Sequence, residues 1–201
     1  MSATPSTMLD LGTKAPAFSL PDVGSGRLIS LNNFAGQKGL LVMFICQHCP
    51  FVKHVKKELA RLGTDYAGED IGIVGISSND PAVSSEDSLD GLKRMVADWG
   101  LSFPVCYDES QEVAKSYAAA CTPDFFLFDA DRRLVYRGQL DDSRPSNGKP
   151  VTGADLRRAI DAVLSGSAVS GNQFPSLGCN IKWRPGNAPA YWGGAVAAQS
   201  R

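Results

Sequence analysis

The sequence has no apolar run that approaches the ~18 residues of a membrane span, so we expect no transmembrane segment. It also lacks an excess of basic residues, because 20 lysines and arginines stand against 21 acidic residues. The chain has a net charge of −1 and no basic stripe, so its charge gives no indication of nucleic-acid binding. The N-terminal stretch MSATPSTMLDLG has neither the basic start nor the apolar core of a secretory signal, so none is expected.

Cysteine is scarce and odd in number, which argues against an extracellular disulfide framework. The chain has five cysteines in 201 residues, and no signal peptide is expected. We therefore predict a cytoplasmic, reducing location in which the thiols are free for chemistry. We expect no resident cofactor or metal, and the sequence does not indicate an oligomeric state.

The most informative stretch is the junction at residues 40–62, LLVMFICQHCPFVKHVKKELARL. Residues 40–45 are all apolar and predict a buried strand. Beyond Pro50, apolar residues recur at the spacing of one helix face: Phe51, Val52, Val55, Leu59 and Leu62. Because Pro is favoured at the first helical position, Cys49 is expected at or just before the N-terminus of this helix.

Cys49 at such a position is predicted to be a nucleophile. The unpaired N–H groups and the dipole of a helix N-terminus stabilise an anion. A thiol there can have its pKa lowered from about 8.5 to roughly 3.5–7.5, which makes it a thiolate near neutral pH. Lys53, Lys56 and Lys57 would lower the pKa further if they face the sulfur. The prediction requires that Cys49 is not sealed in the protein interior.

Hydrophobic periodicity and turn residues outline the remaining elements. The expected strands cover residues 17–20, 27–30, 40–45, 71–76, 103–106, 125–128 and 134–136. The apolar stripes of the expected helices lie within residues 51–62, 89–99, 113–117 and 156–164. This order predicts an α/β fold with a mixed central sheet, helices on both faces and an N-terminal hairpin. Thr152 and Asp155 are expected to form a capping box at the start of the last helix.

Three regions are expected along the chain. Residues 1–11 are polar and aperiodic and predict a flexible arm, whereas residues 12–165 form one domain. Residues 166–201 are rich in Gly, Pro and Ala and lack helical period, yet they contain aromatic side chains: Phe174, Trp183, Tyr191 and Trp192. Because disordered tails are usually poor in aromatic residues, we expect an extended C-terminal tail packed on the domain.

Four motifs carry a resemblance to known proteins: GTKAPAFSLPD, FICQHCPFV, CTPDFFLFD and LVYRGQ. With the order of elements, they resemble the thioredoxin fold and, within it, the redoxins that include the alkyl hydroperoxide reductase/thiol-specific antioxidant (peroxiredoxin) proteins. The resemblance covers roughly residues 12–165 and is closest to an atypical, peroxiredoxin-like subgroup. It implies a thioredoxin-like fold and a thiol-dependent oxidoreductase. It also implies that Pro123 is a cis-proline facing the reactive cysteine and that Thr122 offers its backbone to a substrate.

Neither redox signature of these relatives is intact. If Cys49 is the first cysteine of a thioredoxin, Val52 stands where the second is expected. If Cys49 is the peroxidatic cysteine, Cys46 and Val42 stand where a Thr and a Pro are expected. We therefore favour disulfide exchange with weak peroxide reduction, in redox homeostasis or antioxidant defence. The expected substrate is a disulfide or a hydroperoxide, and the expected electron donor is a thioredoxin or glutathione system.

A second thiol must release the product from Cys49, and the sequence leaves several candidates. Cys46 forms a C-x-x-C pair with Cys49, and Cys121 is expected near the site because it precedes Pro123. Cys179 could return to the site from the tail, and an external thiol is the remaining option. His48 could stabilise the thiolate or move a proton.

Two other functions remain open from the sequence. Cys46, His48, Cys49 and His54 could hold copper or zinc. The His-Cys-Pro step resembles the thioredoxin-fold copper chaperones, although Lys53 stands where those proteins have a second cysteine. The last alternative is a redox-inactive scaffold that binds partners.

Overall fold

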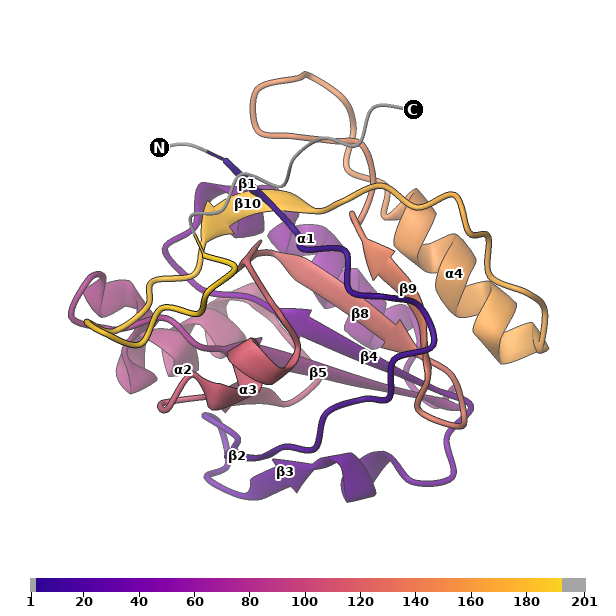
Figure 1. Cartoon of the computed structure of the whole chain (residues 1–201), viewed down its shortest axis with the longest axis horizontal. Coiled ribbons are helices and arrows are strands. Elements are labelled where there is room, and N and C mark those ends of the chain that lie inside the picture. Colours follow the sequence, from indigo (N-terminus) through magenta and orange to yellow (C-terminus); the bar gives the residue numbers. More distant parts are fainter. Residues whose placement is uncertain (1–2, 193–201) are drawn as a thin grey trace.

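The computed structural model describes residues 3–192. A five-stranded sheet forms its centre, in the order β6–β5–β4–β8–β9 (Figure 1). Its strands are β6 (Val105–Tyr107), β5 (Ile71–Ser77), β4 (Gly39–Phe44), β8 (Asp124–Phe128) and β9 (Leu134–Gly138). β4, β5 and β6 run parallel, whereas β8 pairs antiparallel with both β4 and β9. The sheet is therefore mixed, which confirms the prediction.

β4 lies in the middle of the sheet, and every one of its residues is buried. Because successive side chains of a strand point to opposite faces, Leu41 and Met43 enter one core cluster. Leu40, Val42 and Phe44 enter the cluster on the other face. A strand buried on both faces needs apolar residues at every position, which explains the continuous apolar run in the sequence.

Helices cover both faces of the sheet, although unequally. The three longest pack on one face: α1 (Pro50–Asp65), α2 (Leu89–Trp99) and α4 (Ala154–Ser165). The other face carries the short α3 (Glu112–Ser116), the expected hairpin of β2 (Ser19–Pro21) and β3 (Leu28–Ser30), and the 3-10 turn η1 (Leu31–Phe34). Within residues 3–192, no helix combines the length and the apolar character that a membrane crossing requires.

The start of α4 differs from the prediction. Its N-cap is Gly153, with a φ of 66°, and Thr152 and Asp155 form no capping box. Instead, the buried carboxylate of Asp141 accepts hydrogen bonds from the backbone N–H groups of Thr152 and Gly153, both at 2.7 Å. Asp141 follows β9 in the chain, so an acceptor from a distant loop replaces the local cap that the sequence suggests.

The two ends of the chain meet in a second, three-stranded sheet. β10 (Leu177–Asn180) lies between β1 (Thr4–Pro5) and β7 (Cys121–Thr122) and is antiparallel to both (Figure 1). The flexible arm predicted at 1–11 is therefore wrong for residues 4–6, since Thr4–Pro5 is a strand and Ser6 is buried. Of the aromatic residues expected to pack the tail on the domain, Trp183 and Tyr191 do so, whereas Phe174 and Trp192 are exposed. The tail also contributes β10, which the sequence pattern did not predict. The remaining parts of the predicted arm and tail, residues 1–2 and 193–201, lie outside the described residues.

Candidate active site

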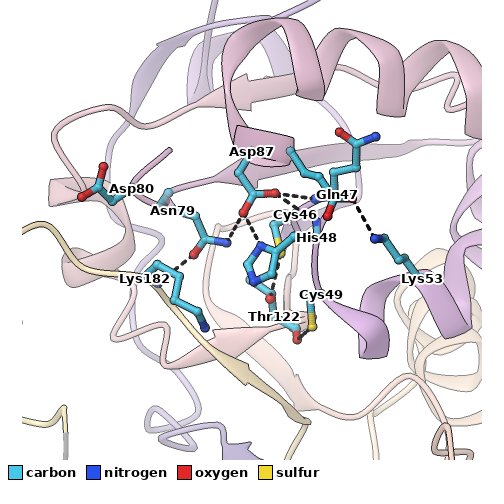
Figure 2. A network of polar contacts seen from close by, with 12 residues as sticks. Cys46, Gln47, His48, Cys49, Lys53, Asn79, Asp80, Asp87, Thr122 and Lys182 are labelled. Atoms are coloured by element: carbon cyan, nitrogen blue, oxygen red, sulfur yellow. Dashed lines mark hydrogen bonds and ion pairs between the residues drawn. The ribbon is translucent and has the colours of Figure 1, made fainter. Parts of the chain in front are cut away.

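Cys49 occupies the position that the sequence predicts, at the N-cap of α1 with Pro50 as the first helical residue. Its backbone is extended, with φ of −68° and ψ of 123°, so the chain leaves β4 and turns into the helix at this residue. The first N–H groups of a helix have no partner within it, and that of Val52 points to the Cys49 sulfur. The protonated Cys49 thiol donates to the carbonyl oxygen of Thr122 at 3.1 Å (Figure 2).

The surroundings of Cys49 lower its pKa well below the ordinary value. The largest contributions are hydrogen bonds from the thiols of Cys179 and Cys46. Burial acts in the opposite direction but is outweighed, with further help from the Val52 N–H group and from Thr122. The Cys49 sulfur is therefore the favoured place for a negative charge in this cluster of thiols.

Two of the three nearby lysines do not meet the condition that they face the Cys49 sulfur. Lys53 forms an ion pair with Glu86 at 2.8 Å on the surface of the protein. Lys56 lies over the ring of Trp99, 5.8 Å from its centroid. The pKa of Cys49 is lowered by the thiols of Cys179 and Cys46 rather than by the positive charges of these lysines.

Cys49 has no solvent-exposed surface, so the accessibility that the sequence analysis required is absent in this conformation. Strand β10 covers the sulfur, with Cys179 against it. The cavity beside the site, lined among others by Phe51, Pro123 and Leu177, has a volume of about 20 Å³. Such a space holds roughly one water molecule. A substrate can reach Cys49 only if the covering strand moves.

The Thr122–Pro123 peptide bond is cis, as the resemblance implies. Thr122 touches both cysteines of the C-x-x-C pair, because its carbonyl oxygen accepts from Cys49 and its Oγ1 lies 3.2 Å from the Cys46 sulfur (Figure 2). Its backbone is not free for a substrate, however. β10 occupies that edge, with Cys179 paired opposite Thr122.

The structure separates the candidate second thiols. Cys46 and Cys179 both lie in the buried cluster of Cys49 and lower its pKa. Cys121 is fully buried and donates to the carbonyl oxygen of Pro123 at 3.6 Å, and burial raises its pKa. Cys106 lies in β6, where burial raises its pKa to about 12. Cys46 and Cys179 are therefore placed for chemistry, whereas Cys121 and Cys106 are core residues.

A buried carboxylate that the sequence analysis missed organises the turn before Cys49. Asp87, at the end of the 3-10 turn η2 (Ser85–Asp87), has no exposed surface. It accepts from the backbone N–H groups of Gln47 at 2.9 Å and His48 at 3.1 Å, from the Asn79 side chain at 2.8 Å, and from the His48 ring (Figure 2). Burial raises the pKa of Asp87, but the hydrogen bonds from His48 and Asn79 outweigh it and lower the pKa.

This cluster was hidden in the sequence because Asp87 lies in the stretch NDPAVSSED, which has the composition of an ordinary loop. The available signal was topological. Loops that follow neighbouring parallel strands meet at the same edge of a sheet, and residues 46–49 follow β4 while Asn79 follows β5. The network fixes the His48 ring beside Cys46, since a His48 nitrogen, the Cys46 sulfur and an Asp87 oxygen lie within 4.8 Å of one another.

The predicted metal set of Cys46, His48, Cys49 and His54 does not assemble. His54 lies on α1 with its ring 3.2 Å from the Ser143 hydroxyl. Among residues 3–192, the group with metal-ligand spacing is Cys46, His48 and Asp87 instead. Both Asp87 oxygens and one His48 nitrogen already take part in hydrogen bonds within the protein. A metal would have to displace these bonds, so the geometry does not favour the metal-binding alternative.

Replacing Asp87 with Ala is expected to lower the free energy of unfolding by about 3 kcal/mol, because buried donors lose their acceptor. The folded pKa of Asp87 is lowered, so its stabilisation is present at neutral pH and is lost as the pH falls below about 4. Urea denaturation at neutral pH measures the difference. Glu86→Ala is the matched control, since the exposed Glu86–Lys53 pair is worth at most about 1 kcal/mol. Equal losses in the two variants would contradict an organising role for Asp87.

Comparisons with known proteins found a family model, curated relatives and solved structures that are similar to this chain. The model of the AhpC/TSA family matches residues 11–137. The thiol-disulfide oxidoreductase ResA of Bacillus thuringiensis is 25% identical over 127 residues, 63% of this chain and 68% of that protein. An uncharacterized conserved protein from Geobacillus kaustophilus has a crystal structure that matches with a TM-score of 0.90 and 51% identity, covering 92% of this chain and 98% of that one. A thiol:disulfide interchange protein of the thioredoxin family from Chlorobium tepidum matches in fold, with a TM-score of 0.59 and 21% identity over 77% of this chain and 98% of that one.

Proposed function

The chain belongs to the AhpC/TSA family and is a thiol-dependent oxidoreductase with a thioredoxin-like fold, and on that premise we propose that it exchanges disulfides through the Cys49 thiolate. The observation that carries the proposal is the position of the Cys49 sulfur. It lies at the N-terminus of α1, in the same buried cluster as Cys46 and Cys179, whose thiols lower its pKa. A low-pKa sulfur beside further thiols is the arrangement that disulfide exchange requires.

The chemistry follows from these contacts. The Cys49 thiolate attacks one sulfur of a substrate disulfide, the substrate S–S bond breaks, and the leaving thiolate takes up a proton. A second thiol then attacks the Cys49 sulfur of the mixed disulfide, forms a disulfide with it and releases the other half of the substrate. Cys46 and Cys179 are both placed for this step. His48, held by Asp87 beside Cys46, is proposed to receive or supply a proton there.

An external reductant must return the resulting protein disulfide to the dithiol. We propose a thioredoxin or glutathione system, because either supplies electrons by the same thiol exchange. All five cysteines are free thiols in the structure, which suits a reducing compartment such as the cytoplasm. A role in redox homeostasis or antioxidant defence belongs to the same proposal. Fractionation of the native cells with an antibody against the chain tests the location.

Disulfide reduction and peroxide reduction are separated by comparing rates on the same preparation. With a dithiol as reductant, we expect turnover of insulin disulfides to exceed consumption of hydrogen peroxide. The reason is that a peroxidatic site needs groups that hold the peroxide oxygens, and Cys46 and Val42 stand where the family motif has Thr and Pro. Val42 is buried inside the core and cannot contribute. Faster consumption of peroxide than of insulin disulfides would overturn the preference for disulfides.

A further inference from the structure

Strand β10 brings a third sulfur to the same helix N-terminus as Cys49. Its register on β7 places Cys179 opposite Thr122, and this pairing sets the Cys179 thiol against the Cys49 sulfur. The backbone N–H group of Phe51 lowers the pKa of Cys179, and that of Val52 lowers the pKa of Cys49. The two cysteines therefore lie in one buried cluster at the start of α1.

The close approach of β10 to β7 depends on a glycine next to Cys179. A Cβ atom on Gly178 would lie 2.0 Å from the Thr122 carbonyl oxygen and 2.6 Å from its carbonyl carbon, far inside van der Waals contact. The backbone around Thr122 cannot yield easily, because Cys49 and Cys46 pack against it. Glycine at position 178 therefore allows β10 to approach β7 closely enough for Cys179 to reach Cys49.

Cys46 is the competing second thiol, and its surroundings differ from those of Cys179. The largest cause that raises the pKa of Cys46 is burial, and the Asp87 carboxylate raises it further. For Cys179 the largest cause is the hydrogen bond to Cys49, whereas Lys182 lowers the pKa. Once the Cys49 sulfur forms a mixed disulfide it has no negative charge. Its contribution to the raised pKa of Cys179 is then lost, which makes the Cys179 thiolate easier to form. Cys49 also raises the pKa of Cys46, so this change favours both thiols. The two differ in their surroundings: the Cys46 sulfur lies 3.2 Å from the Thr122 Oγ1 in a turn that Asp87 holds, whereas Cys179 lies on a strand with only two residues paired to β7.

We propose that Cys179, carried by β10, is the thiol that resolves the mixed disulfide on Cys49. The proposal rests on the function proposed above. The Cys179 thiolate attacks the Cys49 sulfur, the Cys49–substrate bond breaks, and the substrate leaves as a thiolate that takes up a proton. The protein dithiol is thereby oxidised to a Cys49–Cys179 disulfide, and the substrate disulfide is reduced to two thiols.

Strand β10 is held by two short ladders and by hydrogen bonds of its flanking residues, among them Ile181 N–H to the Ala120 carbonyl and the Ser176 hydroxyl to the Gly138 carbonyl. Its ladder with β7 contains the pairs Cys179–Thr122 and Asn180–Cys121, and its ladder with β1 is equally short. Each backbone hydrogen bond contributes only about 1 kcal/mol to stability. The preceding residues 166–176 form neither helix nor strand, whereas Trp183 anchors the chain beyond β10.

The pairing is tested by oxidation of the reduced protein with glutathione disulfide, followed by thiol blocking and trypsin digestion without reductant. Cys46 and Cys49 lie in one tryptic peptide, residues 39–53, and Cys179 lies in another, residues 159–182. A Cys49–Cys179 disulfide therefore joins two peptides, whereas a Cys46–Cys49 disulfide stays within one. We expect the joined peptides in the wild type and in Cys46→Ser. In Cys179→Ser we expect glutathione to remain on Cys49 and turnover of insulin disulfides to fall about tenfold or more.

The failures of the two proposals are distinguishable in this experiment. A disulfide confined to the 39–53 peptide, with normal turnover in Cys179→Ser, overturns the assignment of Cys179 but leaves Cys49 as the nucleophile. If glutathione never attaches to Cys49 in Cys179→Ser, and no disulfide involving Cys49 forms in the wild type, the proposed function fails as well.

A second pair of variants tests β10 without removing a cysteine. Gly178→Ala is expected to push β10 from β7, to raise the rate of Cys49 alkylation by iodoacetamide about tenfold, and to slow formation of the Cys49–Cys179 disulfide. Gly171→Ala is the matched control in the tail, because a Cβ there meets no atom within 4 Å. Peptide mapping reports the labelled cysteine. Equal alkylation of Cys49 in the two variants, with the fold intact by circular dichroism, would overturn the covering role of β10.

Discussion

Replacing Cys49 with Ser is expected to reduce the turnover of insulin disulfides by roughly a thousandfold or more, because a serine hydroxyl does not ionise near neutral pH. In the wild type the thiols of Cys179 and Cys46 and the Val52 N–H group lower the pKa of the Cys49 thiol, which favours the thiolate near neutral pH. An alcohol at the same place gains the same contacts but stays protonated. Initial rates with a dithiol reductant measure the loss.

The control for this variant is Cys106→Ala. Cys106 is also a buried cysteine, but it lies in β6 and belongs to the core cluster on the other face of the sheet. Its variant is expected to retain most of the activity and to lose some stability, as core truncations do. Activity of Cys49→Ser equal to that of Cys106→Ala would remove Cys49 from the mechanism and direct attention to Cys46.

Replacing Asp124 with Asn is expected to stabilise the protein by a few kcal/mol near pH 8. Asp124 follows Pro123, has no exposed surface, and has one carboxylate oxygen without a partner among the described residues. Burial raises its pKa from the ordinary 3.8 to about 8. Each unit of such a shift corresponds to about 1.4 kcal/mol between the two protonation states.

The sign of the pH dependence follows from proton binding. Between about pH 4 and pH 8 the folded protein holds the Asp124 proton, whereas the unfolded chain has released it. The unfolding free energy of the wild type should therefore decrease as the pH rises through this range. Asn cannot ionise, so the variant should lack this decrease and should approach the wild type near pH 4.

Urea denaturation at several pH values measures both curves. Asp131→Asn is the control, because Asp131 lies exposed in the turn between β8 and β9 and should leave the profile unchanged. A profile of Asp124→Asn parallel to that of the wild type would mean that Asp124 is ionised in the folded protein. The hydrogen bond from Ala120, at 3.4 Å, would then be stronger than its length suggests.

The central strand and the first helix of the fold can be predicted from local sequence patterns. The apolar run of β4 and the helical spacing after Pro50 identify a strand and a helix, and both patterns arise within a few residues of one another. The same local signals place Cys49 at the helix N-cap. The start of α4 could not be predicted in the same way. The carboxylate that accepts hydrogen bonds from its first backbone N–H groups belongs to Asp141, in a loop outside the helix.

Only some of the residues at the site could be predicted from the sequence. Cys49, Cys46 and Thr122 share a neighbourhood that the order of elements predicts. The partners that complete it, Asp87 and Cys179, come from a polar loop and from the tail, and neither segment has a periodic pattern that reveals its position. The sequence also suggested an accessible thiol, whereas β10 covers it.

By itself, the sequence determined that a cysteine begins a helix after a buried strand, because helix and strand periodicity and the preference of Pro for the first turn are local properties. Only the tertiary structure decided which groups surround that cysteine. Backbone pairing between β7 and β10, across more than fifty residues of chain, brings the Cys179 thiol to the Cys49 sulfur. Such a contact depends on the register between β7 and β10 and on the absence of a side chain at Gly178. Neither can be predicted from the residues next to Cys49 in the sequence.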